Sequence, residues 1–147
     1  MTDERSIAAL VPQSGAMVLL DEIIAHDESR ITCRALSHRD PANPLVHDGV
    51  LPVWAGIEYA AQAMAAHFGL GAGVPGGAAI GLLGGLRDVA CEVERLDDVA
   101  SPLLISAERL SHDPAGSIYA FSVTAESDGR PLLTGRATVV QQRRDDR

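Results

Sequence analysis

The chain has 147 residues and a formal net charge of −8, which predicts one domain with a sizeable core and argues against a nucleic-acid-binding surface. No apolar run is long and unbroken enough to cross a membrane, and the N-terminal MTDERSIAAL is not a secretory signal. We therefore expect a single domain over residues 1–147, with 1–9 as a lead-in, 141–147 as a polar tail, and a cytoplasmic location.

All twelve basic residues are arginine. Without lysine, Schiff-base chemistry and a Walker-type phosphate loop are excluded, because both need a lysine amine. Cys33 and Cys91 match no metal or redox spacing, so we interpret them as reduced core residues. The histidines and carboxylates also lack the spacing of metal ligands, and the sequence predicts no metal and no cofactor.

Two strands are expected before the middle of the chain. Met17–Ile24 is apolar, and Arg30–Leu36 alternates apolar and polar residues after a turn at Asp27–Ser29, so the two segments predict a hairpin. His38–Gly49 follows and is rich in Pro, Asp and Asn. It is the longest predicted loop, and long loops in compact domains tend to carry function.

The segment Leu51–Leu70 predicts the one long helix of the chain. From Trp54 to Phe68 it is alanine-rich and apolar on every face, which is typical of a buried helix. Pro52 suits the first turn of this helix, and the glycines from Gly69 onward suit its end. Glu58 is the exception, because an ionised carboxylate in an apolar setting must be paired, shifted in pKa or used in function.

Four more strands are predicted after the helix, and glycines inside the first of them indicate a bulge or a close approach of the backbone to the helix or to an acyl chain. The segments are Ala78–Leu96, Pro102–Leu110, Ser117–Ala125 and Pro131–Val140. Two strands, one buried helix and a run of antiparallel strands define an α+β fold. We expect a long curved antiparallel sheet wrapped around the helix, with exposed edges that favour dimerisation.

Three segments resemble the hotdog-fold 3-hydroxyacyl-(acyl-carrier protein) dehydratases: LVPQSGAMVLLDEI, LPVWAGIEYAAQAMAAH and GLLGGLRD. The similarity is closest to the small dehydratase-like proteins of bacterial gene clusters for polyene and acyl-lipid synthesis, and it extends over Leu10–Val140. Its most specific part is GIEYAAQAMA, where Glu58 precedes an Ala-Gln pair as in the dehydratase helix. Gln13 stands where those dehydratases usually have histidine.

The resemblance implies removal of water from a 3-hydroxyacyl group carried on acyl-carrier protein or CoA, with Glu58 as a catalytic residue. Those dehydratases also carry a catalytic histidine in a His-Phe-Pro-Gly loop, which this chain lacks. The nearest equivalent is His47, 11 positions before Glu58. The resemblance further implies a homodimer, or a heterodimer with a related hotdog subunit, in which the His and the Glu come from different subunits.

Dehydration needs a base for the proton next to the carbonyl, an acid for the departing hydroxyl, and a group that polarises the carbonyl. His47 suits the first role, and Glu58, with its pKa raised by apolar surroundings, suits the second. Unpaired backbone N–H groups at the helix start suit the third. Gln62, at i+4 from Glu58, is expected to hold the carboxyl in position, and Gly56 to leave room for the thioester chain.

Other interpretations of these residues stay open. Glu58 would be structural if it formed an ion pair with Arg34 or Arg87, and Gln62 would be structural as a buried amide that ties the helix to the sheet. Of the remaining histidines, His67 is expected at the far end of the helix, where it caps the helix or faces solvent, and the others are expected at turns and exposed; they are His26, His38 and His112.

Two alternative functions are an acyl thioesterase on the same fold and a non-catalytic subunit that binds acyl chains or pairs with an active dehydratase. Acyl-carrier proteins are acidic, as is this chain, so docking of a carrier would need a local arginine cluster. The candidates are Arg34, Arg39, Arg87 and Arg136.

Overall fold

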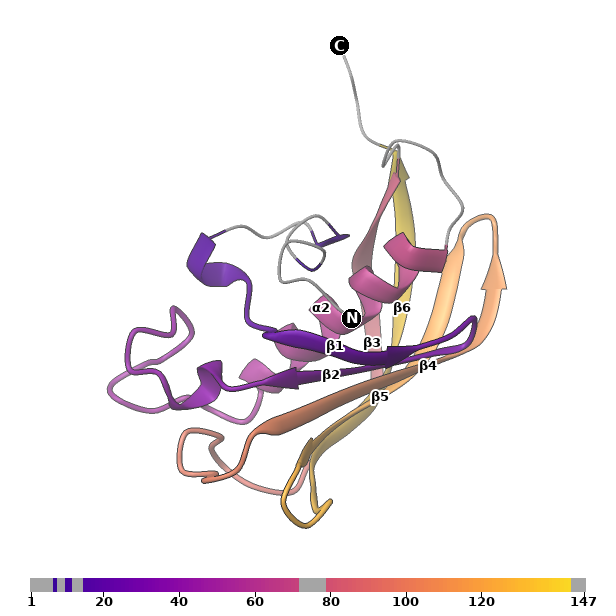
Figure 1. Ribbon diagram of the computed structural model, residues 1–147. Coiled ribbons are helices and arrows are strands. Elements are labelled where there is room, and N and C mark those ends of the chain that lie inside the picture. Colours follow the sequence, from indigo (N-terminus) through magenta and orange to yellow (C-terminus); the bar gives the residue numbers. More distant parts are fainter. Residues whose placement is uncertain (1–6, 8–9, 12–14, 72–78, 144–147) are drawn as a thin grey trace.

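The computed structural model describes residue 7 and residues 10–11, 15–71 and 79–143. In this part of the chain a curved antiparallel sheet of six strands holds one long helix, α2 (Ala55–Gly71), on its concave side (Figure 1). The sheet order is β1-β2-β4-β5-β6-β3. The strands are β1 (Glu22–His26), β2 (Arg30–Ala35), β3 (Ala79–Cys91), β4 (Leu103–Asp113), β5 (Gly116–Ala125) and β6 (Pro131–Arg143). The predicted α+β class and wrapped sheet are confirmed.

Alternation of side chains along each strand creates the two faces of the sheet. In β5, Tyr119, Phe121 and Val123 are buried against the helix, and the residues between them point outward. The strand β2 does the same with Ile31 and Cys33. The concave face therefore forms the core, and the convex face carries the polar residues.

Helix α2 sits close to the sheet because Gly56 has no side chain. A Cβ atom at this position would lie 2.8 Å from Leu133 Cδ2 and 3.5 Å from Val123 Cγ2. Leu133 and Val123 are fully buried on β6 and β5. The helix backbone therefore packs directly on the middle of the sheet, and α2 contacts every strand from β2 to β6.

The first strand is shorter than the sequence predicts. It begins at Glu22 instead of Met17, and a short 3₁₀ helix, η1 (Gly15–Met17), precedes it. Leu19 and Leu20 are both buried, although neighbouring residues of a strand point to opposite faces. The backbone N–H of Leu19 binds a side chain of α2 instead of a neighbouring strand. The apolar pattern there reflects packing under the helix.

Other details of the helix, of β3 and of the loop also differ from the prediction or refine it. Pro52 lies before the helix, which begins at Ala55. The strand β3 ends at Cys91, and the segment up to residue 96 continues outside the sheet. The predicted irregularity among the glycines of β3 is confirmed by a register shift between Leu83 and Gly85. The loop before the helix contains a second 3₁₀ turn, η2 (Ser37–Arg39).

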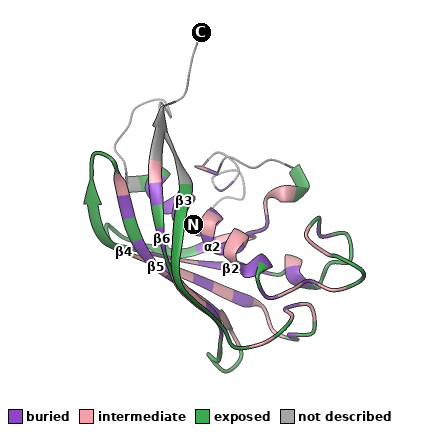
Figure 2. Ribbon diagram, turned by 180° about the vertical axis from the view of Figure 1, so that it is seen from behind, coloured by how far each residue is buried: buried purple, intermediate pink, exposed green. Residues whose placement is uncertain are grey.

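The edge strand β3 exposes large apolar side chains. Leu83, Leu86 and Val89 are 39%, 45% and 38% exposed, and Figure 2 shows the described part of β3 exposed at the margin of the sheet. Leu86 pairs with Ala137, which is buried on the concave face, so Leu86 faces the helix side of the sheet. An apolar edge of this kind favours pairing with another chain.

Gly56→Val should lower the free energy of unfolding by about 1–3 kcal/mol, because the added carbons must displace buried side chains of β5 and β6. Urea titration measures this loss. Gly85→Val is the matched control, since a Cβ atom there meets no atom within 4 Å, and its unfolding free energy should stay close to that of the wild type. Equal stability of the two variants would contradict the close helix–sheet contact.

Candidate active site

Glu58 lies on a stripe of α2 that the chain itself leaves partly uncovered. Trp54, Ile57, Glu58 and Ala61 are spaced i, i+3, i+4 and i+7, which places them on one side of the helix. Trp54 is 58% exposed, and the other three are half-buried. The expectation of a helix buried on every side is therefore wrong on this side. The Glu58 carboxyl lies at the margin of the core.

The backbone N–H groups at the start of α2 are already engaged. Those of Ala55, Gly56 and Ile57 donate to the carbonyls of the residues three positions before them, at 2.9, 2.9 and 3.0 Å. The prediction that these groups are unpaired is wrong, because the turn before the helix winds tightly enough to satisfy them. A thioester carbonyl would have to find other donors.

His47 lies on a tight turn at the surface. Asp48 and Gly49 have φ values of 52° and 77°, and His47 and Val50 exchange backbone hydrogen bonds of 2.8 and 3.0 Å. The His47 side chain is 83% exposed, with Nε2 3.5 Å from Asp48 Oδ2. In the described part of one chain, neither His47 nor Glu58 lines any of five surface hollows of about 220–440 Å³. Their catalytic roles stay predictions.

Gln62 and Gly56 have clear structural roles in this chain. The Gln62 side chain is fully buried, its Oε1 accepts from the Leu19 N–H at 2.8 Å, and its Nε2 donates to the Met17 carbonyl at 2.5 Å. The amide thus ties the helix to the segment before β1 instead of to the sheet. Gly56 faces Leu133 and the sheet. Their predicted contributions to substrate binding remain untested.

Tyr59 anchors the loop that carries His47, a role that sequence reasoning missed. Its buried hydroxyl donates to Ser37 Oγ at 2.7 Å, because the Ser37 hydroxyl is itself donating to the Leu19 carbonyl. The Tyr59 oxygen also accepts from Asn43 Nδ2 at 3.0 Å. The i, i+3 pair of polar-tipped residues Tyr59 and Gln62 in an otherwise apolar helix is the signal that could have revealed this network.

Two histidines expected at the surface are buried, with 1% exposure each. His67 Nε2 donates to the Asp27 carbonyl at 2.9 Å, so Nδ1 accepts from the Tyr119 hydroxyl at 2.6 Å. His38 Nε2 lies 3.0 Å from the carbonyls of Val99 and Ser101, and its buried Nδ1 has no hydrogen-bond partner among the described residues. Burial lowers the pKa of both imidazoles below 6.5. His26 and His112 are exposed, as predicted.

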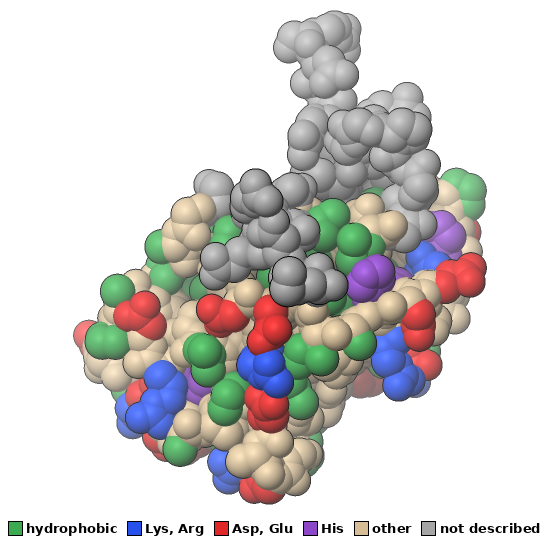
Figure 3. All heavy atoms as spheres, in the orientation of Figure 1, with side chains coloured by type: hydrophobic (Ala, Val, Ile, Leu, Met, Phe, Trp, Pro, Cys, Tyr) green, Lys and Arg blue, Asp and Glu red, His purple; other side chains and the backbone are tan. Residues whose placement is uncertain are grey.

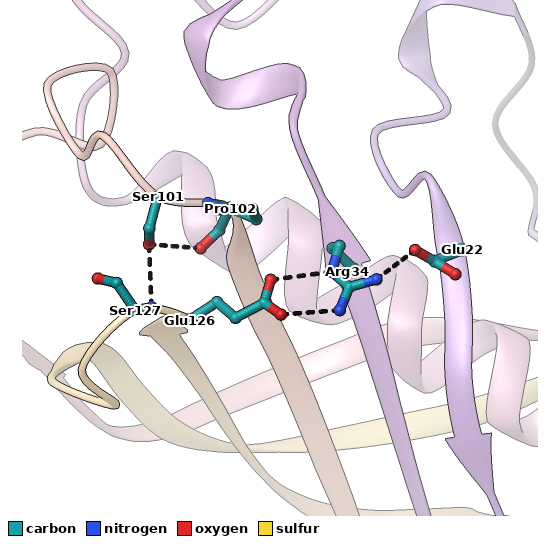
Figure 4. A network of polar contacts seen from close by, with 6 residues as sticks. All are labelled: Glu22, Arg34, Ser101, Pro102, Glu126 and Ser127. Carbon is teal, nitrogen blue, oxygen red and sulfur yellow. Dashed lines mark hydrogen bonds and ion pairs between the residues drawn. The ribbon is translucent and has the colours of Figure 1, made fainter.

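Arg34 is engaged with carboxylates of the sheet (Figure 4). Its Nε and Nη2 bind the two oxygens of Glu126 at 2.8 and 2.7 Å, and Nη1 binds Glu22 at 2.5 Å. The bonds to Arg34 lower the pKa of Glu126. The Arg34 guanidinium is therefore already paired with two carboxylates on the convex face, away from α2.

The cysteines are both free. Cys33 is buried, and burial raises the pKa of its thiol to about 12, which makes it unreactive. Cys91 is exposed, so its assignment to the core is wrong: it lies at the end of an edge strand. Among the described residues, no three His, Cys, Asp or Glu side chains cluster in the way a metal ion would require. No described helix is long and apolar enough to span a bilayer.

The curved sheet around one central helix places the chain among the hotdog-fold proteins. The sequence model of the ApeP-like family, described as ApeP dehydratase, matches residues 5–147, and the chain belongs to this family. No curated protein sequence matches it.

Solved structures give the same class. A chain of the dehydratase heterocomplex ApeI:P from Xenorhabdus doucetiae is 26% identical to this one. The match covers 94% of this chain and 91% of that chain, with a TM-score of 0.77. A thioesterase from Haemophilus influenzae is 13% identical over 97% of this chain and 92% of its own, with a TM-score of 0.68. A hypothetical thioesterase with coenzyme A from Streptococcus pneumoniae is 13% identical over 85% and 88%, with a TM-score of 0.59.

Gln62→Leu should lower the free energy of unfolding by about 2–4 kcal/mol, because it leaves the Leu19 N–H and the Met17 carbonyl without partners in a buried setting. Denaturant titration measures the change. Ala61→Gln places an amide on the uncovered stripe next to Gln62 and should change the unfolding free energy by less than about 1 kcal/mol. A small effect of Gln62→Leu would contradict the structural role.

The two buried histidines predict a stability that falls with acidification. Their folded-state pKa values lie below 6.5, so below that pH the unfolded chain binds protons that the folded chain refuses. This contribution is complete above about pH 6.5 and is lost as the pH falls toward the folded-state pKa values. Urea unfolding at pH 7.5, 6.5 and 5.5 tests it. His67→Gln should flatten the pH dependence.

Proposed function

We propose that the chain removes water from a 3-hydroxyacyl thioester to give the enoyl thioester, acting as one subunit of a hotdog dimer. The observation that carries this proposal is the position of Glu58, in the first turn of the one long described helix, on its partly exposed side. Membership of a dehydratase family supports the reaction type. A 3-hydroxyacyl group on acyl-carrier protein is the substrate we favour.

In the proposed reaction a base takes the proton from C2 of the acyl chain. The Glu58 carboxyl donates a proton to the C3 hydroxyl, which leaves as water, and the C2–C3 double bond forms. The proton gained by the base then returns to the Glu58 carboxylate before the next turnover. Glu58 suits the acid role because apolar neighbours, Trp54 just before α2 and Ile57 on it, would surround it once a second subunit covers this side of the helix.

The base is a histidine, either of this chain or of the second subunit. His47 is the candidate in this chain, but its side chain is 83% exposed, and a general base works best in a site from which bulk water is excluded. In a homodimer His47 of one subunit would serve Glu58 of the other. In a heterodimer with a related hotdog subunit, that subunit would supply the histidine. The heterocomplex of the similar ApeI:P protein supports the second arrangement.

The β3 edge is the surface that we favour for the second subunit. Leu83, Leu86 and Val89 are exposed there on the helix side of the sheet. Pairing along β3 would bury these side chains and satisfy the open backbone groups of the edge. Trp54, also exposed, starts the stripe of α2 that carries Glu58. A partner that covers both surfaces would enclose Glu58.

Glu58→Gln should reduce enoyl formation by about 10²–10⁴-fold, because the amide cannot donate the required proton. The measurement is loss of water from 3-hydroxybutyryl thioesters, followed by mass spectrometry, for the chain alone and co-expressed with a related hotdog subunit. His47→Ala should cause a similar loss only if His47 is the base. His26→Ala, another exposed histidine, is the control and should keep full activity.

Normal enoyl formation by Glu58→Gln would overturn the proposal. Release of free 3-hydroxy acid in place of enoyl product would identify a thioesterase. Full activity of His47→Ala in the heterodimer, together with loss in Glu58→Gln, would assign the base to the partner subunit.

A further inference from the structure

Two arginines lie directly opposite each other on the convex face of the sheet. Arg87 on β3 pairs in register with Arg136 on β6, and both are exposed. They end a row that crosses five strands through directly paired residues: Arg30, Glu108, Ala120, Arg136 and Arg87. Like charges directly opposite in a sheet destabilise it, so this pair does not contribute to folding.

The charge of this pair is not balanced within the described part of the chain. Arg30 pairs with Glu108 at 3.2 Å, Arg34 with Glu22 and Glu126, and Arg95 with Asp97. On the face drawn in Figure 3 the arginines likewise lie next to carboxylates. No ion pair among the described residues includes Arg87 or Arg136.

The surroundings of the pair explain why no carboxylate reaches it. Ala120, which pairs directly with Arg136, carries no charge. Glu108 is two strands away from Arg136, roughly 10 Å at the usual strand spacing. The neighbours along β6, Thr134 and Thr138, are uncharged. Asp88, next to Arg87 in the chain, lies at an irregularity of β3 with φ 55° and takes part in none of these ion pairs.

The pair borders a hollow of about 240 Å³, which Gly85, Ile118 and Thr138 also line. The hollow is half open to solvent, so it does not close around a small anion. Two guanidinium groups on an open sheet suit an acidic protein surface, because each can take a carboxylate in a bidentate bond. An acidic protein would be repelled by most of a chain with net charge −8. Arg39, Arg109 and Arg130 also take part in none of these ion pairs, but in the described part of the sheet only Arg87 and Arg136 are arginines paired directly with each other.

We propose that Arg87 and Arg136 form the docking site for an acidic carrier protein that delivers the acyl thioester. The choice of a carrier rests on the proposed function; the need for an acidic partner rests on the unbalanced pair itself. Of the four arginine candidates, Arg34 is already bound by two carboxylates, whereas Arg39, which reaches the Val99 carbonyl at 3.4 Å, lies in a 3₁₀ turn and has no arginine paired with it. Because Arg87 lies on β3, the docked carrier would sit beside the edge proposed for the partner subunit.

The test compares binding and turnover in Arg87→Gln/Arg136→Gln, made in the same dimer as the wild type. Binding of holo acyl-carrier protein at low salt should weaken roughly tenfold, and the difference should shrink at high salt, because exposed charges are screened. KM for 3-hydroxybutyryl carrier protein should rise by a similar factor. Turnover of the carrier-free N-acetylcysteamine thioester should not change. Arg30→Gln is the matched control on the same row, and its carrier binding should stay within about twofold of the wild type.

A Gln/Gln variant that binds the carrier as tightly as the wild type would overturn the proposal, as would a wild type that binds no carrier. A rise in KM for the CoA thioester but not for the carrier substrate would assign the pair to a phosphate of CoA and also overturn it. Arg87→Lys/Arg136→Lys should retain most binding, and the melting temperature of the Gln/Gln variant should be unchanged or higher. Carrier binding that depends on the two arginines, without turnover of any thioester, would support docking and reject the dehydratase.

Discussion

The contact between α2 and the sheet at Gly56 is the constraint on which the rest of the structure depends. With no side chain there, the helix lies directly on Leu133 and Val123 in the middle of the sheet. A sheet that contacts a helix this closely must curve around it, and its strands β2 to β6 do so (Figure 1). The same contact fixes the rotation of the helix about its axis, and so decides that the side with Trp54 and Glu58 is turned away from the sheet.

The polar side chains of α2 then fix the segments that run over it. Gln62 binds the backbone before β1, Tyr59 binds Ser37 and Asn43 in the loop before the helix, and His67 binds the turn after β1 and Tyr119 on β5. Each of these side chains is buried and satisfied, so each adds order where an unpaired group would destabilise the fold. The helix therefore determines the path of the loop that carries His47. This loop leads into the first turn of α2, which carries Glu58.

A single chain leaves apolar surface exposed on one face of the sheet and unbalanced charge on the other. The uncovered stripe of α2 and the apolar edge of β3 are both on the helix side of the sheet, whereas the unbalanced arginines lie on its convex face. Apolar surface favours burial by a stable partner, and exposed charge favours a transient one that salt can release. This distribution of apolar and charged surface fits a subunit with one stable interface and one transient interface, which agrees with the proposed dehydratase dimer and its carrier.

The sequence by itself determined the one long helix, the order and approximate bounds of the later strands, the bulge among the glycines of β3 and the hotdog resemblance, because apolar periodicity and turn residues act locally. The tertiary structure decided what depends on distant neighbours. Leu19 and Leu20 are apolar like a strand but pack under α2, His38 and His67 look like surface histidines but fill the core, and the helix has an uncovered side that its uniform composition hides. The pairing of Arg87 with Arg136 depends on a register between strands almost 50 residues apart, which no local pattern encodes.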